Sequence, residues 1–355
     1  MFITIAVIAY NEESTIGNIL DDISKQDYNH SLIEVVLVDS ASTDGTKTVM
    51  QEFARENKMG AGQIKVLDNP KRTLPCGWNV LLDNYTGDAV IRVDAHAHIP
   101  EDFVSKNVRV LETGEYICGG QRPNIIDKPT PFKETLLLAE SSMFGSSIAS
   151  YRNNPGKTYV KSLFHAAYRR EVFEKVGFFN EELVRTEDNE IHYRMRKAGY
   201  KLCFDPDIIS YQYTRSSLKA MLKQKYANGY WIGKTSKVCP KCLSIYHFVP
   251  FAFVSAIIAS GSVIGATGLA ECIKKRHNHT LGKGISALRK VTVVLTTVMW
   301  VLYALMASGM AAVSAFKAED KRNITNACLP VLFLLLHLSY GIGTIAGLMD
   351  KSKRG

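Results

Sequence analysis

Three apolar stretches in the last third of the chain restrict its architecture more than any other feature of the sequence. They are residues 245–270, 291–316 and 327–349. Each exceeds the roughly 20 residues that a helix needs to cross a bilayer. We therefore expect residues 1–235 to form a domain outside the lipid and residues 236–355 to form a multi-pass domain in the cell membrane. Because the amino terminus lacks the basic segment of a signal peptide, we expect the first domain to be cytosolic.

Counting apolar stretches and counting charges lead to different membrane topologies. Three simple spans would place Glu271–Lys290 outside, yet this segment carries six Lys or Arg residues against one acid. Short loops this basic normally stay in the cytosol. The first stretch is also rich in small residues over Ala259–Gly268, which favour close packing or a break over a simple lipid-facing helix. We therefore expect 245–270 to bend back as a re-entrant or interfacial hairpin, with only the other two stretches crossing.

Basic residues gather next to the apolar stretches. The chain has a net charge of +9, and Arg215–Lys241 holds seven Lys or Arg residues and no acid. Charge in this position indicates a membrane, not nucleic acid, as the partner. Seven cysteines in so long a chain do not make a disulfide framework. Cys239–Cys242 is a single CxxC pair, which is a weak signal for zinc.

The amino-terminal part of the chain alternates short apolar runs with helical patterns. Strands are expected at Phe2–Ala9, Ile33–Val38, Ile64–Leu67 and Ala89–Val93, and helices at Glu13–Lys25, from the turn after Asp39 to about Asn57, and at Leu74–Tyr85. The second run is apolar almost throughout, as is typical of a parallel strand buried on both faces. This alternation predicts an α/β fold with a doubly wound parallel sheet and ligands at the carboxyl ends of its strands.

Later elements follow the same logic. A strand is expected at Leu163–Tyr168 and a helix, ended by Gly177, at Arg169–Val176. The segment Phe132–Ile148 repeats its apolar residues with the period of an amphipathic helix. Two interpretations of its broad apolar face stay open: packing on the sheet, or contact with a membrane surface or a lipid-borne substrate.

Polar side chains follow the strand that ends near Val93. If the backbone stays extended through Val90–His98, then Asp94, His96 and His98 project to one side, because side chains alternate along a strand. One carboxylate and two imidazoles that face a common point suit a divalent metal carrying a diphosphate. The alternative is an exposed loop with incidental histidines.

A second polar group follows the strand Ile33–Val38. Asp39 stands at its end, where a carboxylate can accept hydrogen bonds from a base or a ribose, while Ser42 and Asp44 are placed to cap the next helix. The sequence has no GxGxxG after its first strand and no GxxxxGK[ST] anywhere. Dinucleotide-binding and P-loop folds therefore lose their main support.

A third polar group opens the helix that runs to about Gly199. Glu187, Asp188 and Glu190 lie at its amino-terminal end. Acids favour a helix start through the helix dipole, which explains them without any function. The functional interpretation is a carboxylate at a rigid helix tip that takes a proton from an acceptor hydroxyl. The spacing does not separate the two.

Together these motifs resemble the family 2 glycosyltransferases, which have the GT-A fold, a Rossmann-like nucleotide-diphospho-sugar transferase domain. The matching segments are Tyr10-Asn-Glu-Glu, Val38–Thr46, Asp94-Ala-His96 at the family's DxD position, and Glu187-Asp188 at its catalytic acidic pair. The resemblance covers about residues 1–235. Within the family, the chain looks most like membrane-bound glucosyltransferases of succinoglycan-type exopolysaccharide assembly.

The resemblance assigns roles by position. The donor-binding residues would be Tyr10, Glu12, Asp39, Lys71, Arg72, Asn79 and Asp94, with Gln224 and Trp231 bordering the acceptor or the leaving diphosphate. Asp188 would be the general base, beside Glu187. Asp94 and His96 would hold a divalent cation, either Mn²⁺ or Mg²⁺. Imidazole in place of the family's second aspartate suits Mn²⁺ better.

The implied reaction is an inverting transfer of a sugar, such as glucose, from a UDP-sugar to a polyprenyl-diphosphate-linked saccharide. Asp188 would deprotonate the acceptor hydroxyl while metal and basic groups stabilise the departing diphosphate. The product would belong to an exopolysaccharide or cell-surface glycan. Two alternatives stay open. One is a polyprenyl-phosphate sugar synthase, whose acceptor needs no strong base. The other is a non-catalytic scaffold that binds sugar nucleotides.

Overall fold

The protein is described by a computed structural model that covers residues 1–351 apart from 146–155, 216, 277–281 and 319–322. Its strands are β1 (Ile3–Ala9), β2 (Ile33–Asp39), β3 (Gln63–Asp68), β4 (Ala89–Asp94), β5 (Ala97–His98), β6 (Ile117–Gln121), β7 (Asn124–Ile125), β8 (Thr158–Val160), β9 (Ala167–Arg169), β10 (Leu202–Ile209) and β11 (Tyr211–Tyr213). Its α-helices are α1 (Ile16–Ser24), α2 (Thr46–Glu56), α3 (Leu74–Leu82), α4 (Phe103–Glu112), α5 (Pro131–Ser141), α6 (Arg170–Val176), α7 (Glu187–Lys197), α8 (Leu218–Val238), α9 (Val249–Arg276), α10 (Lys283–Phe316) and α11 (Leu329–Met349). Short 3₁₀ turns include η1 (His30–Leu32), η3 (Pro240–Cys242), η4 (Ile245–Phe248) and η5 (Ile324–Cys328).

The main sheet has eight strands in the order β3-β2-β1-β4-β9-β6-β10-β8. The first four are mutually parallel, as the alternation of strands and helices predicts. The sheet as a whole is mixed, because β9 runs antiparallel to both β4 and β6, and β8 runs antiparallel to β10. The parallel arrangement predicted from the first four strands is therefore confirmed for them and does not extend through the rest of the sheet. A small second sheet, β5-β11-β7, lies beside the first.

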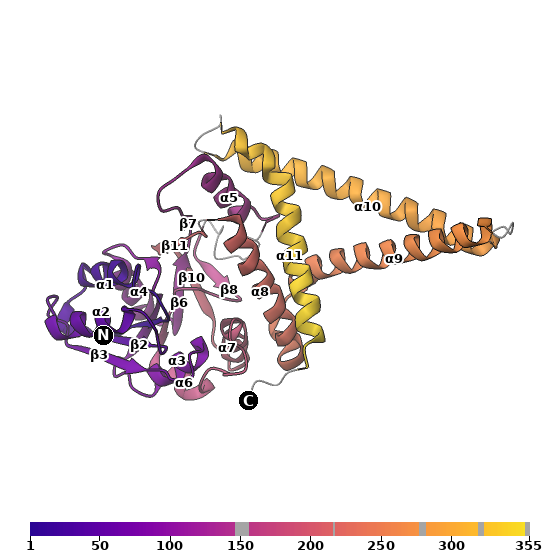
Figure 1. The fold of residues 1–355 in the computed structure, drawn as a ribbon. Helices are drawn as coiled ribbons and strands as arrows, with labels where there is room; N and C mark the ends of the chain where they lie inside the picture. Colours follow the sequence, from indigo (N-terminus) through magenta and orange to yellow (C-terminus); the bar gives the residue numbers. More distant parts are fainter. Residues whose placement is uncertain (146–155, 216, 277–281, 319–322, 352–355) are drawn as a thin grey trace.

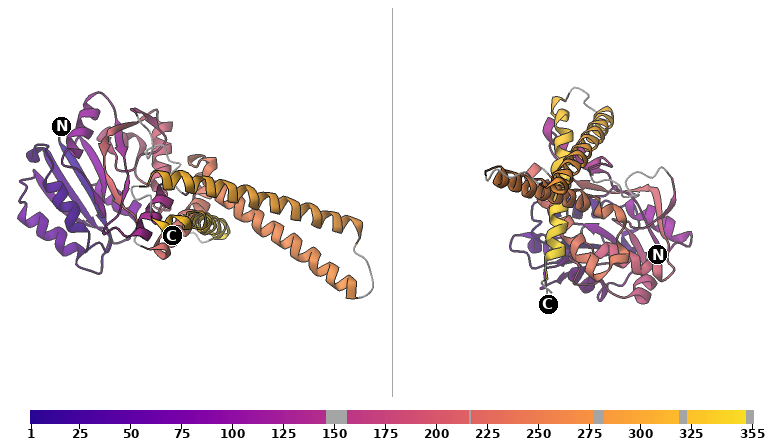
Figure 2. Two further views of the ribbon diagram at one scale, coloured as in Figure 1. Left: turned by 90° about the horizontal axis from the view of Figure 1, so that it is seen from above. Right: turned by 90° about the vertical axis from the view of Figure 1, so that its right-hand side faces the viewer.

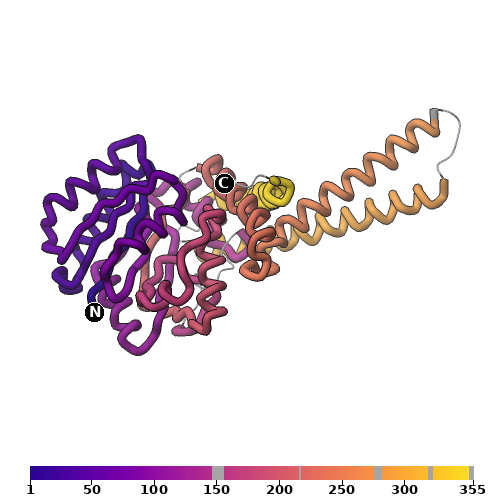
Figure 3. Tube along the Cα trace, turned by 90° about the horizontal axis from the view of Figure 1, so that it is seen from below, coloured from indigo at the N-terminus to yellow at the C-terminus, as the bar shows by residue number. Residues whose placement is uncertain are grey.

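Helices cover both faces of the main sheet, as Figure 1 and the trace in Figure 3 show. Residues of α1, α2 and α4 share a core with one face, and residues of α3, α6 and α7 share a core with the other. All seven residues of β2 are buried, which explains their almost unbroken apolar character. The expected amino-terminal strands and helices are confirmed, with ends that shift by a few residues.

Helix α5 packs on a surface that the sequence did not predict. Its residues Leu136 and Ala139 are fully buried in a cluster with residues of α11, among them Phe333. This part of the apolar face is therefore covered by the chain's own helices and not by the sheet, while Phe132 and Met143 of the same predicted face stay exposed. The helix ends at Ser141, and the expected continuation over 146–148 lies outside the described residues.

Three helical segments of the described chain are long and apolar enough to cross a membrane: Ile245–Lys275, Lys283–Phe316 and Ile324–Met349. In Figures 1 and 2, α9 and α10 form a long hairpin that projects away from the sheet domain. Helix α9 is unbroken over its 28 residues, so a re-entrant bend within 245–270 is wrong. Without water to satisfy freed backbone groups, an apolar segment keeps its helical hydrogen bonds despite its small residues.

Helix α11 behaves differently, since it lies along α8 and runs across the direction of the α9–α10 hairpin in both views (Figures 1 and 2). The two helix backbones touch through glycines. A Cβ on Gly229 would lie 2.0 Å from the carbonyl oxygen of Tyr340, and one on Gly347 would lie 2.0 Å from that of Tyr230. Only glycine permits this approach. The expected boundary between residues 235 and 236 therefore falls inside α8, a helix that links the sheet domain to the apolar helices.

Candidate active site

Two loops at the carboxyl edge of the sheet support each other. The hydroxyl oxygen of Ser42 accepts a hydrogen bond from the backbone N–H of Asn11 (3.0 Å). In return, the side-chain oxygen of Asn11 accepts a hydrogen bond from the backbone N–H of Thr43 (2.8 Å). Asp44 accepts from the backbone N–H of Thr46 at the start of α2 (3.1 Å), but the cap position itself is Gly45, so Asp44 supports the turn before the helix instead of capping it. Ser42 does not cap α2 either but joins the two loops.

The strand register brings two aspartates to the same edge. Ile8 of β1 pairs with both Val38 of β2 and Asp94 of β4, so Asp39 and Asp94 end the two strands that flank β1 on either side. Asp39 is buried, and both its carboxylate oxygens lie 3.3 Å from the backbone nitrogen of Ser42. Tyr10, which follows β1, is 46% exposed at this edge. These positions suit recognition of a nucleoside, which stays a prediction for Tyr10 and Asp39.

The centre of the site is a buried arginine. Arg92 is only 5% exposed, and its guanidinium lies 3.6 Å from Asp94 and 3.5 Å from Glu187. It therefore connects the end of β4 with the start of α7. Burial disfavours the charge of Arg92, but the carboxylates of Asp94, Glu187 and Asp188 outweigh this and raise its pKa.

Asp94 also contacts His165, with 3.7 Å between its carboxylate and the imidazole Nε2. Burial raises the pKa of Asp94, but the neighbouring imidazole of His165 and the charge of Arg92 outweigh this effect. They hold the pKa of Asp94 well below its usual range. Asp94 is therefore a permanent anion at the carboxyl edge of the sheet.

The histidines after Asp94 do not converge as an extended backbone would require. The strand ends at Asp94, a turn occupies Ala95 and His96, and His98 belongs to β5 in the other sheet. His98 lies 2.7 Å from Asp22 and stacks on Tyr211, so the expectation that it joins the other two is wrong. Among the residues that the structure describes, no three His, Cys, Asp or Glu side chains are grouped as metal ligands.

His96 stays close to Asp94 and also contacts Glu12, with 3.1 Å between Nδ1 and the carboxylate. The hydrogen bond with Glu12 raises the pKa of His96 against the opposing effect of burial. A carboxylate on one ring nitrogen orients the other nitrogen, and metal-binding histidines usually have such a partner. Asp94 and His96 thus supply a carboxylate oxygen and an oriented imidazole that fit a cation such as Mn²⁺. This assignment stays a prediction.

Two carboxylates open α7. Glu187 is 2% exposed; its Oε1 contacts Arg92, and its Oε2 has no hydrogen-bond partner among the described residues. Asp188 reaches partly into solvent and accepts a hydrogen bond from the backbone N–H of Asn189 (2.7 Å). Burial raises the pKa of both carboxyl groups, against the opposing charge of Arg92. A partly exposed carboxylate with a raised pKa is suited to accept a proton.

The third acid of this helix has a different role. Glu190 is buried and pairs through both oxygens with the guanidinium of Arg194, at 2.7 and 2.9 Å. Arg194 also donates to the backbone carbonyl of Phe178 (2.6 Å). Glu190 therefore fixes α7 to the segment before it and has no free oxygen aimed at the site.

Helix α8 covers this end of the sheet domain. Asn228 accepts a hydrogen bond from Arg185 (3.2 Å), and Thr235 bonds Thr186, so α8 is held beside the start of α7. The two predicted residues on this helix are both shielded. Trp231 is buried edge-to-face against Tyr230, and the buried Oε1 of Gln224 has no partner among the described residues. Their contact with an acceptor stays a prediction.

Two of the three predicted residues after β3 have structural partners. Lys71 forms an ion pair with Glu181 (2.6 Å), and Asn79 bridges the backbone N–H and carbonyl of Phe179. Arg72 has a left-handed backbone, with φ of 63°. These contacts hold the loop before α7 against α3, and a part in nucleotide binding stays a prediction for all three residues.

Several site residues were not predicted. Arg92 and His165 are polar residues inside apolar runs, and such a buried charge requires a partner, so their sequence context was a usable signal. Arg185 and Arg215 had no such signal. They come near the site only in the fold. Burial raises the pKa of Glu12, but the hydrogen bonds with His96 and Thr15 outweigh burial and lower it, and the charge of Arg215 makes a smaller contribution in the same direction.

Comparison with known proteins agrees with this geometry. Residues 4–177 match the model of the family described as glycosyl transferase family 2. The chain is 26% identical over 265 residues to the dolichyl N-acetyl-α-D-glucosaminyl phosphate 3-β-D-2,3-diacetamido-2,3-dideoxy-β-D-glucuronosyltransferase of Methanococcus voltae, over 73% of this chain and 80% of that protein. It is 28% identical over 200 residues to the succinoglycan biosynthesis protein ExoA of Rhizobium meliloti (strain 1021), over 55% of this chain and 58% of that protein.

A solved structure supports the fold over almost the whole chain. The mannosyltransferase PcManGT from Pyrobaculum calidifontis, in complex with GDP-Man and Mn²⁺, aligns with a TM-score of 0.57 at 19% identity. The alignment covers 99% of this chain and 88% of that one. The chain is therefore a glycosyltransferase, and its residues 4–177 form a family 2 domain within a GT-A fold.

Proposed function

We propose that the protein transfers a sugar from a UDP-sugar to a lipid-linked saccharide, with inversion at the anomeric carbon, in the synthesis of an exopolysaccharide or another cell-surface glycan. The observation that carries the proposal is Asp188, a partly exposed carboxylate of raised pKa at the tip of α7, beside the Asp94–Arg92–Glu187 ion pairs. The relatives named for a dolichyl-linked acceptor and for succinoglycan biosynthesis support the acceptor class.

The reaction is a single displacement. Asp188 takes the proton of the acceptor hydroxyl as its oxygen attacks the anomeric carbon, and the bond from that carbon to the nucleoside diphosphate breaks. Glu187 stays paired with Arg92, which leaves Asp188 as the carboxylate free to receive the proton. Because attack and departure occur on opposite faces of the sugar, one displacement inverts the anomeric configuration.

The departing diphosphate needs positive charge. Asp94 and His96 would hold a divalent cation, which when bound offsets the charge of the diphosphate. Arg215, exposed after β11, and Arg185, before α7, add cationic groups near the same edge. On the other side of the edge, the exposed ring of Tyr10 and the buried carboxylate of Asp39 suit the uracil and ribose.

The membrane arrangement follows from the direction of the apolar helices. Helix α9 has 28 residues, which makes it about 42 Å long, against a hydrocarbon core of about 30 Å. We infer that α9 and α10 cross the bilayer. Helix α11 runs across this hairpin (Figure 2) and is held closely against α8, and we therefore infer that it lies along the membrane surface. The sheet domain then stays in the cytosol, where sugar nucleotides are available.

The test is a panel of UDP-sugars incubated with membranes that contain the protein and lipid-linked acceptors, with products identified by mass. A lipid-linked saccharide that gains one sugar supports the proposal. A product that consists of a polyprenyl phosphate carrying a single sugar would instead identify a sugar synthase. Absence of UDP release from every donor would identify a binding scaffold.

A further inference from the structure

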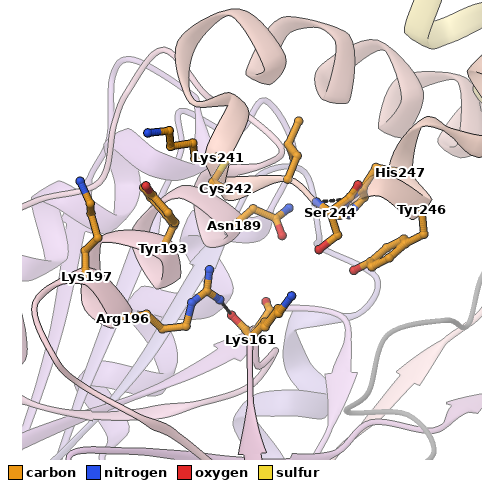
Figure 4. Close-up of a pocket in the computed structure, with 12 residues that line it drawn as sticks. Lys161, Asn189, Tyr193, Arg196, Lys197, Lys241, Cys242, Ser244, Tyr246 and His247 are labelled. Carbon is orange, nitrogen blue, oxygen red and sulfur yellow. Dashed lines mark hydrogen bonds between the residues drawn. The ribbon is translucent and has the colours of Figure 1, made fainter.

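A cavity of about 360 Å³ lies between the sheet domain and the first apolar helix. Its walls come from the end of β8, from the outer face of α7 and from the η3–η4 connection that leads into α9 (Figure 4). We call it the junction pocket and define it by Lys161, Asn189, Arg196, Lys197, Lys241 and Tyr246. None of the residues assigned above to the donor or the metal lines it.

The junction pocket is positively charged. Lys161, Lys197, Arg196 and Lys241 line it, and no Asp or Glu does. Among the described residues, none of these four cations has a carboxylate within 4.0 Å, unlike Lys25, Lys71 and Arg194, which form ion pairs. Partial burial lowers the pKa of Arg196, which donates a hydrogen bond to the backbone carbonyl of Lys161. Cations gathered in a concave site without acids attract an anion.

The pocket also adjoins apolar surface. Its wall at Tyr246 belongs to η4, the turn from which α9 begins, and Ile245–Lys275 is an apolar segment long enough to span a membrane. Ile245 is 88% exposed and Val249 is 62% exposed, and both lie at the amino-terminal end of this apolar segment. Burying apolar side chains such as these away from water is favourable in free energy. An anionic group in the pocket and a hydrocarbon chain along α9 would therefore satisfy both surfaces.

We propose that the junction pocket binds the phosphate group of a membrane lipid. Lys197 contributes charge from α7 and Lys241 from η3, and Ser162, Asn189 and Tyr193 contribute polar side chains. Asn189 directly follows Asp188 in α7, so a lipid held here has its phosphate on the helix face next to the proposed base. Two lipids share this chemistry: an anionic phospholipid, and the diphosphate of the lipid-linked acceptor. The second case rests on the proposed function.

The test uses the full-length protein in phosphatidylcholine nanodiscs, with binding measured directly and without turnover. Three probes are compared: phosphatidylglycerol in the disc, undecaprenyl diphosphate in the disc, and inorganic pyrophosphate in solution. The double variant Lys197→Gln with Lys241→Gln should bind the lipid probe about 30-fold more weakly, since each basic residue near an anionic surface contributes roughly fivefold. Both side chains are exposed, so folding should be retained.

A matched control separates a site from general attraction. Lys25→Gln with Lys58→Gln removes the same charge from surface ion pairs of the sheet domain, and should leave lipid binding unchanged. Equal losses in both double variants would overturn the proposal, as would no loss in the pocket variant. Pyrophosphate binding as tight as lipid binding would reject the lipid. The lipid probe that binds more tightly shows whether the pocket binds a phospholipid or the diphosphate of the acceptor. Because the assay measures binding and not turnover, this result stays valid even if the transferase assay fails.

Discussion

Replacing Asp188 with asparagine tests the proposed base with little change in shape. Asparagine is nearly isosteric, and its side-chain oxygen can still accept the hydrogen bond from the backbone N–H of Asn189, now 2.7 Å from Asp188. It cannot take a proton from the acceptor. General-base catalysis contributes about 10²–10⁴-fold, so we expect turnover to fall by that factor while UDP-sugar binding stays nearly constant.

The same change should not weaken the fold. Because the pKa of Asp188 is raised in the folded protein, the folded state loses stability as pH rises through that raised value. The substituted asparagine does not titrate, so the variant should unfold at an equal or higher temperature at neutral pH. For the wild type, turnover should fall on acidification at a higher pH than an ordinary aspartate would give, since the base must be deprotonated.

The matched control is Glu190→Gln, on the same helix. It weakens the paired contacts with Arg194, at 2.7 and 2.9 Å, and hydrogen bonds to charged groups contribute about 1.5–3 kcal/mol. We expect a lower unfolding temperature and nearly normal turnover, the opposite pattern to Asp188→Asn. Single-turnover assays with saturating donor, alongside thermal unfolding, measure both quantities. A loss of less than about fivefold in the Asp188 variant would refute its role, since general-base contributions are larger.

Three further predictions concern the metal, the helix contact and the membrane. Activity should be lost in excess chelator and return better with Mn²⁺ than with Mg²⁺, and His96→Ala should stay folded but lose most activity; full activity in chelator contradicts this. Gly347→Leu should lower the free energy of unfolding in detergent by about 1–3 kcal/mol through overpacking against Tyr230, whereas Gly265→Leu, with no atom within 4 Å of its added Cβ, should not. In a variant without the other six cysteines, Cys272 at the far end of α9 should react with an impermeant thiol reagent on intact cells; lack of reaction would keep the basic loop in the cytosol.

Local patterns in the sequence determined those features that depend on neighbouring residues. The parallel strands β1–β4 and the helices between them follow from apolar runs of strand length that alternate with helical periodicity. The apolar helices follow from length and composition. The four motifs of the site could be located because each lies where a strand ends or a helix begins, and such ends carry distinctive residue types.

Features that depend on distant partners were decided only in the fold. The antiparallel β9 between β4 and β6, and the burial of α5 against α11, rest on contacts between segments far apart in the chain, which no local period specifies. The divergence of His96 and His98 came from a turn after Asp94, stabilised by Glu12 and Asp22 on other elements. Arg92 connects Asp94 to Glu187 because the sheet and α7 place these residues together, and a buried charge takes its meaning from the groups that surround it.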